Sequence, residues 1–443
     1  MTHQPRDPYH VGASLDAKAL GCEMYERIQR LYPICRSITG DGVRETLREI
    51  GREIPIQTEE VPTGTPVFDW TVPKEWNIRD AYVKKLSGER VVDFRASNLH
   101  VVNYSVPVRQ RLPLAALRPH LHSIPEHPDW IPYKTSYYAE TWGFCLSHRQ
   151  LMSLDDEEYE VCIDSSLTDG HLTLGECVLE GRESAEILIS CHVCHPSLCN
   201  DNLSGISVAV TLARMLAQVS RRHTYRFLFI PTTIGAITWL ARHEDVGTRI
   251  RHGLVLACVG DRGRVTYKRS RRGNAAVDRA VEQALRQSGE SFDVVDFTPY
   301  GYDERQYCSP GFNLPVGLLS RTPHGRFPEY HTSADNLELV DPDSLADTAM
   351  TCLRVLEALE GDAVYRSLNA RCEPQLGRRG LYASLGGHAG RRDFEMALLW
   401  VMNLSDGVHS LLDIAERSQM PFVAIRAAAD ALAREALLEE VPR

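Results

Sequence analysis

The sequence predicts an α/β protein whose central sheet is flanked by helices, with a small β-rich part and a C-terminal winged-helix part. Three observations predict this class. In the middle of the chain, nearly continuous apolar runs alternate with helical segments, as expected for strands covered by helices on both faces. A proline-rich region of short alternating segments precedes them. A pattern of helix, helix–turn–helix and strand ends the chain.

Length and composition indicate a soluble globular protein of two or three domains. The chain has 443 residues, which exceeds one ordinary core, and 43% hydrophobic and 24% charged residues are common values for this class. The net charge of −10 argues against a general binder of nucleic acids or anionic membranes. Residues 1–16 lack the apolar core of a signal peptide, and nothing resembles a membrane span. We therefore expect a cytoplasmic protein without a membrane partner.

The first part of the chain combines two helical segments with a β-rich region. Residues 15–32 have helical periodicity, and residues 43–51 indicate a second helix. The short, proline-separated segments that follow are typical of a small β-rich domain. Because both helices can pack on the later α/β part, we expect one α/β domain from residues 15–55 and 184–362. Residues 56–183 would then be an insertion in it.

The α/β part shows clear candidate elements. Strands are predicted at residues 186–191, 225–231, 253–259 and 315–320. Helices are predicted at residues 204–220, 274–288 and 341–360.

Residues 375–443 are predicted to form the winged-helix domain. Its elements would be helices at 393–403, 410–419 and 422–435 and a strand at 437–441. The last two helices carry more acidic than basic side chains, namely Asp413, Glu416, Asp430 and Glu435 against Arg417, Arg426 and Arg434. A groove-reading helix should be basic, so we favour packing or an interaction such as a homo-oligomer contact over nucleic-acid binding.

The most informative segment follows the first of the four predicted strands. It places His192, His195 and Asp201 on the loop that leaves the strand, where open α/β sheets carry their chemistry. Imidazoles and carboxylates are zinc ligands, and His331 can supply a further one. The helix that starts at residues 202–205 has Asn and Ser as capping residues, which would fix the orientation of Asp201.

A hydrolytic zinc site also needs a carboxylate that moves a proton from the attacking water to the leaving amine. Glu304 and Glu329 are the candidates, with Glu304 first. The polar segments around them supply the side chains expected to contact substrate, where arginine suits a substrate carboxylate. These candidates are Tyr302, Asp303, Arg305, His324, Arg326 and Tyr330.

Other interpretations of these residues remain open. A histidine at a strand end is often only a hydrogen-bonded core residue. Cys191 and Cys194, with Cys199, could form a redox pair or a structural zinc knuckle. No second cysteine pair lies at zinc-ribbon spacing, so the catalytic interpretation is favoured.

The motifs resemble those of the zinc aminopeptidases of the bacterial leucyl aminopeptidase and glutamate carboxypeptidase group. His192, the segment Asp201-Asn202-Leu203-Ser204-Gly205 and the segment Tyr330-His331-Thr332-Ser333-Ala334-Asp335 match in order and in spacing. The resemblance covers about residues 15–51 and 183–361. It implies a mixed sheet flanked by helices. The architecture of the whole chain looks closest to a bacterial aminopeptidase-like subfamily that has an inserted β domain and a C-terminal winged helix. Three segments resemble signatures of that subfamily, namely Arg36-Ser37-Ile38-Thr39-Gly40, Thr135-Ser136-Tyr137-Tyr138 and Trp142-Gly143-Phe144-Cys145.

The chain departs from this group at several ligand positions. The group has a pair of glutamates, a base and a ligand, where residues 231–236 of this chain contain no carboxylate. Cys258, with Asp261 beyond it, stands where the group has a further aspartate ligand, and Cys194 replaces an aspartate two positions after the first histidine. The resemblance therefore implies one zinc ion (Zn²⁺) per chain, held by His192, Asp201 and His331, with His195 replacing or joining His192.

The expected function is that of a zinc-dependent aminopeptidase-type amidohydrolase. It would remove an aminoacyl group from a peptide, an aminoacyl amide or a small biosynthetic intermediate. The alternative is a catalytically inactive, peptidase-like binding or scaffold protein, because motif matches alone do not establish chemistry.

Overall fold

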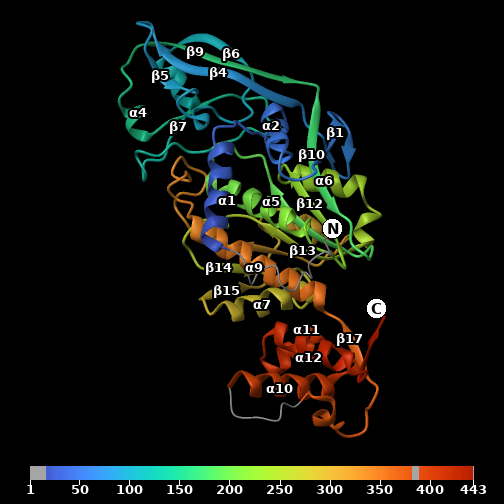
Figure 1. Cartoon of the computed structure of the whole chain (residues 1–443). Helices are drawn as coiled ribbons and strands as arrows, with labels where there is room; N and C mark the ends of the chain where they lie inside the picture. Colours follow the sequence, from blue (N-terminus) through green and yellow to red (C-terminus); the bar gives the residue numbers. More distant parts are fainter. Residues whose placement is uncertain (1–15, 382–388, 443) are drawn as a thin grey trace.

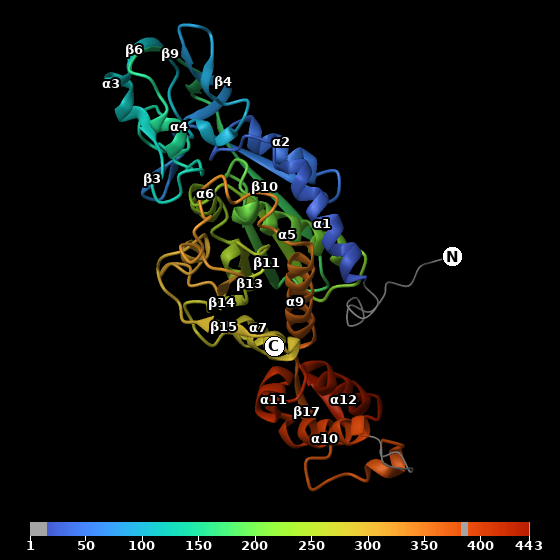
Figure 2. The same cartoon turned by 90° about the vertical axis from the view of Figure 1, so that its left-hand side faces the viewer.

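The computed structural model describes residues 16–381 and 389–442. Nearly all of the N-terminal segment 1–16, and the predicted domain ends at residues 15 and 443, lie outside the described residues. Figure 1 shows three bodies in a row: a β-rich part at the top, a helix-flanked sheet in the middle and a helical C-terminal part at the bottom. Figure 2 shows the same order from the side.

An eight-stranded sheet forms the middle body, with the order β1-β10-β12-β11-β13-β16-β14-β15. Its four central strands run parallel to one another, and they are β12 (Thr224–Ile230), β11 (Glu186–His192), β13 (Ile250–Leu256) and β16 (Val316–Ser320). Every residue of β11 and β12 is buried, because helices cover both faces of the sheet. The predicted apolar strands are thus the centre of the sheet.

The outer strands make the sheet mixed, as the predicted fold class requires. β14 (Val265–Lys268) runs antiparallel to β16, and β15 (Phe292–Val295) runs beside it. On the other side, β10 (His171–Leu179) pairs antiparallel with β12, and β1 (Gln57–Pro62) forms the edge. The sequence analysis placed β1 and β10 in the inserted part; the structure places them in the main sheet, because the buried face of β10 continues the apolar surface beside β12.

Helices cover the two faces of the sheet unequally. One face carries α1 (Ala17–Leu31), α2 (Asp41–Ile50), α5 (Ser204–Leu216), α7 (Ala276–Ser288) and α9 (Pro342–Gly361), whose apolar residues share one hydrophobic cluster. The other face carries α6 (Ile234–Arg242) and α8 (Glu304–Tyr307), which pack in a second cluster with the β-rich part. The two N-terminal helices therefore belong to the main α/β body.

The β-rich part is built on a four-stranded antiparallel sheet with the order β5-β4-β9-β6. Its strands are β4 (Glu75–Lys85), β5 (Arg90–Asp93), β6 (Val108–Pro113) and β9 (Glu158–Thr168). Long loops and short elements lie beside this sheet: β2 (Pro66–Val67), β3 (Trp70–Thr71), α3 (Leu114–Leu117), β7 (Leu121–His122), β8 (Phe144–Cys145) and α4 (His148–Met152). The whole part is inserted between β1 and β10 of the main sheet.

The C-terminal part has the predicted winged-helix pattern. Its helices are α10 (Ala389–Leu404), α11 (Leu411–Ser418) and α12 (Phe422–Arg434). A small sheet of the order β18-β17-β19 completes it, from β17 (Val364–Ser367), β18 (Asp406–Ser410) and β19 (Leu438–Val441). Among the described residues, none of the helices is long and apolar enough to cross a membrane.

Candidate metal centre

The candidate site lies where the order of the central strands reverses. β11 lies between β12 and β13 in the sheet. The chain therefore runs from β11 to β12 on one side of it and then crosses to β13 on the other side. In open α/β sheets, such a switch point leaves a crevice at the carboxyl ends of the strands. His192 is the last residue of β11, and its side chain is buried there.

Asp335 shapes the loop that brings Asp201 to the same place. One carboxylate oxygen of Asp335 accepts the backbone N–H of Asn200 at 2.5 Å, and the other accepts that of Asp201 at 2.9 Å. Its backbone carbonyl also accepts the N–H of Cys199 at 3.1 Å. Burial raises the pKa of Asp335 to about 8, although the backbone donors oppose this shift. Asp335 ends the motif that contains Tyr330 and His331, although no role at the site was predicted for it.

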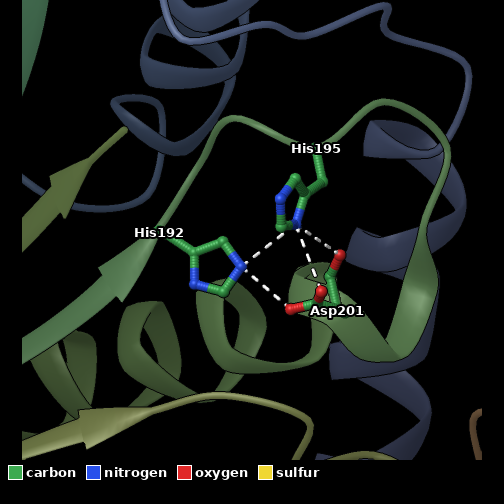
Figure 3. Close-up of side chains that lie close together, drawn as sticks. All are labelled: His192, His195 and Asp201. Atoms are coloured by element: carbon green, nitrogen blue, oxygen red, sulfur yellow. Dashed lines mark hydrogen bonds and ion pairs between the residues drawn. The ribbon is translucent and has the colours of Figure 1, made fainter. Parts of the chain in front are cut away.

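Three side chains meet at the centre of the site (Figure 3). His192 Nε2 lies 2.9 Å from Asp201 Oδ1, and His195 Nδ1 lies 3.3 Å from Asp201 Oδ2. The two imidazole nitrogens are 3.2 Å apart. Burial favours the neutral acid, but His195 and His192 outweigh this effect and hold the pKa of Asp201 well below its usual value.

The donor set of this centre fits a zinc ion. The ligand atoms of His192, His195 and Asp201 all lie within 4.8 Å of one another, and all three residues are buried. Two imidazole nitrogens and a carboxylate oxygen are a common protein ligand set for catalytic zinc, which leaves one position for water. No other such group of histidine, cysteine or acidic side chains occurs in residues 16–381 and 389–442.

His331 joins the centre from the opposite side. Its Nε2 lies 3.0 Å from Asp201 Oδ2, so this oxygen is close to both His195 and His331, while Oδ1 is close to His192. His331 is one-third exposed, and its ligand atom is not part of the compact group formed by the other three side chains. Burial lowers the pKa of His331, which favours the neutral imidazole that a metal requires.

The inserted part reaches the centre through Tyr133. Its ring makes edge contacts with His195 and His331, at centroid distances of 5.2 and 5.1 Å. The backbone N–H of Tyr133 donates to the carbonyl of His331 at 2.7 Å. Next to it, Ile131 and Ser333 exchange two hydrogen bonds of 2.9 and 2.8 Å. The insertion thus holds His331 in place, a role that the sequence analysis missed.

Arg36 fixes the loop that carries His195. Its buried guanidinium donates from Nε to the carbonyl of His195 and from Nη1 to the carbonyl of Leu31, both at 2.8 Å. Burial lowers the pKa of Arg36 to about 10, which still leaves the side chain charged at neutral pH. The segment that resembles a subfamily signature therefore has a local structural role, because it anchors one wall of the site.

Three of the side chains predicted to contact substrate gather around the histidines. Tyr302 stacks on His192 at 5.1 Å, and Tyr330 stacks on His331 at 4.0 Å. His324 packs edge-on against Tyr302 at 5.3 Å. Burial raises the pKa of Tyr302 well above its usual value, so its hydroxyl stays protonated and can donate a hydrogen bond.

The candidate acids and arginines do not belong to this group of aromatic side chains around the histidines. Glu304 is fully buried, and its Oε1 lies 2.6 Å from Lys268 Nζ, which also donates to the carbonyls of Thr298 and Tyr300. This ion pair ties Glu304 to β14 and opposes its use as a base. Glu329 is half-buried and Arg326 is exposed, and no hydrogen bond joins either described side chain to the histidine–aspartate centre. Arg305 is adjacent to Glu304 on α8.

The cysteines near the site are buried, free thiols. Burial raises the pKa of Cys191, Cys194 and Cys199 above the usual value. Redox chemistry and zinc binding both require the thiolate, which these surroundings disfavour. The burial of these thiols therefore argues against a redox pair and against a zinc knuckle, and it favours the histidine–aspartate centre as the metal site.

Comparisons with known proteins agree with this architecture. The family model "Domain of unknown function (DUF4910)" matches residues 25–362, and a winged helix-turn-helix model matches residues 363–440. A Clostridium acetobutylicum protein is 52% identical over 95% of this chain and 97% of its own length. Its provisional name is that of a polysaccharide biosynthesis protein with an aminopeptidase-like domain.

Solved structures show the same fold. A crystal structure of a Clostridium acetobutylicum protein, provisionally named a peptidase, has a TM-score of 0.92 at 51% identity and covers 96% of this chain and 98% of its own. A zinc aminopeptidase from Bacillus subtilis has a TM-score of 0.56 at 12% identity and covers 76% of this chain and 94% of its own. At that identity the second likeness shows the fold alone, which is that of the zinc aminopeptidases.

Proposed function

We propose that this chain, which belongs to the DUF4910 family and carries a C-terminal winged helix-turn-helix, is a zinc-dependent amidohydrolase of the aminopeptidase type. The observation that carries the proposal is the buried cluster of His192, His195 and Asp201 at the switch point of an aminopeptidase-like fold. Such a cluster at the carboxyl ends of parallel strands is suited to binding and reaction rather than to stability.

His192, His195 and Asp201 would hold the metal, and His331 would contact the second oxygen of Asp201. Zinc, when bound, polarises a carbonyl and lowers the pKa of a bound water. We propose one ion per chain, because Thr232, Thr233 and Cys258 stand where the resembling aminopeptidases have further carboxylates. His331 would then orient Asp201 or complete the ligand set of that single ion.

The surrounding side chains suit the binding of an amide. The protonated hydroxyl of Tyr302, next to His192, can donate to the carbonyl oxygen of a scissile amide. Tyr133 and Tyr330 cover His331 and would keep bulk water from the reacting bond. Arg305 and Arg326 remain our candidates for contacts with a substrate carboxylate.

The substrate we propose is a peptide or a small biosynthetic intermediate that carries an aminoacyl or other acylamino group. The inserted part closes over the histidines through Tyr133, which favours small substrates over folded proteins. The provisional name of the Clostridium acetobutylicum relative suggests a saccharide precursor as one such intermediate. We propose no nucleic-acid partner for the winged helix, since Arg426 is paired with Asp430 at 3.0 Å within α12.

The test is the metal content and the amidase activity of the full chain and of an Asp201→Asn variant. We expect about one zinc per chain and hydrolysis of some members of a panel of aminoacyl amides, and we expect the variant to lose both. His409→Ala, in the exposed surface of the winged helix, is the control and should retain both. Zinc without turnover on any amide would support the alternative of a binding protein. A chain that takes up no zinc at all would contradict the proposal.

A further inference from the structure

The segment after β12, which lacks a carboxylate of its own, is in contact with a carboxylate from another segment. Residues 231–236 follow β12 and contain no acidic side chain, although the resembling aminopeptidases have their base there. In the structure, Thr232 Oγ1 donates a hydrogen bond of 2.7 Å to Oδ1 of Asp303. Asp303 is the residue before α8, in the segment of the chain between β15 and β16.

Asp303 has an oxygen that the protein leaves without a partner. The residue is only 1% exposed, and its Oδ2 is buried without a hydrogen bond. A buried carboxylate oxygen that lacks a donor costs free energy, and native proteins keep few such groups outside functional sites. An atom of a substrate or a water molecule is the partner that such an oxygen would receive.

The groups around Asp303 do little to stabilise a negative charge on its carboxylate. On its own segment, Glu304 is paired with Lys268, and the guanidinium of Arg305 lowers the pKa of Asp303 and so favours its ionised form. The thiols of Cys191 and Cys194, from β11 and the loop after it, and the hydroxyl of Tyr307, from α8, also lie near Asp303, and all are held protonated because burial raises their pKa. Burial raises the pKa of Asp303 to about 7, against the opposing effect of Thr232.

Asp303 lies on the same edge of the sheet as the histidine–aspartate centre. The preceding residue, Tyr302, stacks on His192. The buried thiol of Cys194, between His192 and His195 in the sequence, lies 4.0 Å from the carbonyl oxygen of Thr232, whose hydroxyl binds Asp303. The loop of Asp303 and the centre are therefore neighbours, joined by Tyr302 and Cys194.

We propose that Asp303 is the catalytic proton carrier of this site, with Thr232 as its positioning residue. Oδ2 of Asp303 accepts a proton from the attacking water while the water oxygen forms its bond to the scissile carbonyl carbon. The same carboxyl then gives this proton to the amine nitrogen as the carbon–nitrogen bond breaks. The products are a carboxylic acid and an amine, and Asp303 returns to its starting state. This inference rests on the amidohydrolase function proposed above.

The first test compares Asp303→Asn with the wild-type chain at equal zinc loading. The amide cannot accept a proton, so kcat should fall by roughly 100-fold or more while the zinc content stays at the wild-type level. Asp303→Glu should recover part of the rate. Asp296→Asn removes a carboxylate that is 87% exposed and should leave the rate unchanged. An Asp303→Asn variant that keeps the full rate, or a Glu304→Gln variant that alone loses it, would overturn the inference while the proposed function stands.

The second test measures the role of Thr232 through pH dependence. Thr232→Val removes the hydrogen bond that lowers the pKa of Asp303, so the acidic limb of the kcat/KM profile should move to higher pH with little change in KM. Infrared difference spectra of the metal-free chain should show a carboxyl band that titrates near neutral pH and is absent in Asp303→Asn. An unmoved profile, or the same band in both chains, contradicts the inference. A wild-type chain without turnover overturns the proposed function and this inference together.

Discussion

The two parts attached to the α/β body relate to the candidate site in opposite ways. The inserted part, between β1 and β10, supplies Tyr133, whose ring packs against His195 and His331. The winged helix follows α9 and lies at the far end of the molecule (Figure 2). The difference shows that a part inserted between strands near the site can become part of its wall, whereas one added after the last helix forms a separate surface.

The two parts also contact the body at different places. The inserted part joins the loop of His331 by backbone hydrogen bonds and shares a hydrophobic cluster with α6 and α8. The winged helix shares the other hydrophobic cluster with α7 and α9, and Arg279 of α7 adds ion pairs with Asp413 at 2.6 Å and Glu416 at 2.9 Å. Because the inserted part contacts the loop of a candidate ligand, changes in it should affect the site more than changes in the winged helix.

The largest effect is expected from Tyr133→Ala. The change removes a buried ring between two histidines, so we expect a loss of about 3 kcal/mol in the free energy of unfolding. Without the ring, His331 and His195 are less well oriented, and the zinc dissociation constant should rise at least roughly 10-fold, which corresponds to about 1.4 kcal/mol. Urea unfolding and zinc titration measure the two effects.

The control for this change is Tyr133→Phe. It keeps the ring and removes only the hydroxyl, which lies 2.9 Å from that of Tyr137. We expect a loss of about 1 kcal/mol in stability and an unchanged zinc affinity. Equal zinc affinities in Tyr133→Ala and the wild type would show that the inserted part does not shape the metal centre.

A smaller effect is expected from Ser333→Ala. Ser333 Oγ accepts the backbone N–H of Ile131 at 2.9 Å, and its loss leaves that N–H without a partner. We expect stability to fall by about 1 to 2 kcal/mol and zinc affinity to fall by a few-fold, because this bond ties the insertion to the segment of His331. Ser333→Thr retains the hydroxyl and should behave like the wild type. A zinc affinity as low as that of Tyr133→Ala would show that the backbone link matters more than the ring.

The sequence predicted the centre of the fold better than its edges. The runs that form β11 and β12 are mostly apolar because both faces of the sheet are covered, and this pattern can be recognised without knowing the neighbouring strands. β14 and β15 have four residues each, too few for a periodic pattern to emerge. Residues 171–179, which form β10, were assigned to the inserted part, since only the pairing of β10 with β12 shows to which sheet they belong.

The same limit applies to the candidate site. His192, His195 and Asp201 lie within ten residues on one loop, so their spacing alone indicated a common site. The contacts of Asp335 with Asp201 and of Thr232 with Asp303 join residues 134 and 71 positions apart. No local pattern records such pairs, which arise only when the loops at the end of the sheet meet. The side chains that position the site were therefore harder to predict than the candidate ligands.

For the winged helix, Arg279→Ala should loosen the boundary without changing the site. Arg279 is 24% exposed, and solvent screens its two ion pairs, so we expect a loss of only about 0.5 to 1 kcal/mol. Hydrogen exchange should become faster in α11, while zinc affinity and amide hydrolysis keep their wild-type values. Arg279→Lys restores the charge and should recover part of the protection. A loss of zinc in Arg279→Ala would contradict the separation of the winged helix from the metal centre.

The smallest effect concerns the acid stability of the winged helix. Backbone hydrogen bonds from His409 and Val408 lower the pKa of Asp406 to about 2, below the value of about 4 of an unfolded chain. A carboxyl with a lowered pKa stabilises the fold above pH 4, and this stability is lost as the pH falls through about 2. Because Asp406 is 44% exposed, solvent screening reduces the contribution to roughly 0.5 kcal/mol.

Asp406→Asn should remove this acid-dependent part, which urea unfolding of the winged helix between pH 5 and pH 2 can measure. His409→Ala is the matched control, since it keeps the backbone donor at position 409 and should retain most of the dependence. The metal centre provides the contrast: its histidines must be neutral to bind zinc, so zinc is lost at a higher pH than the stability of the winged helix. If Asp406→Asn changed the pH at which zinc is released, the winged helix and the metal centre would be energetically coupled. That result would contradict the view that the winged helix does not influence the site.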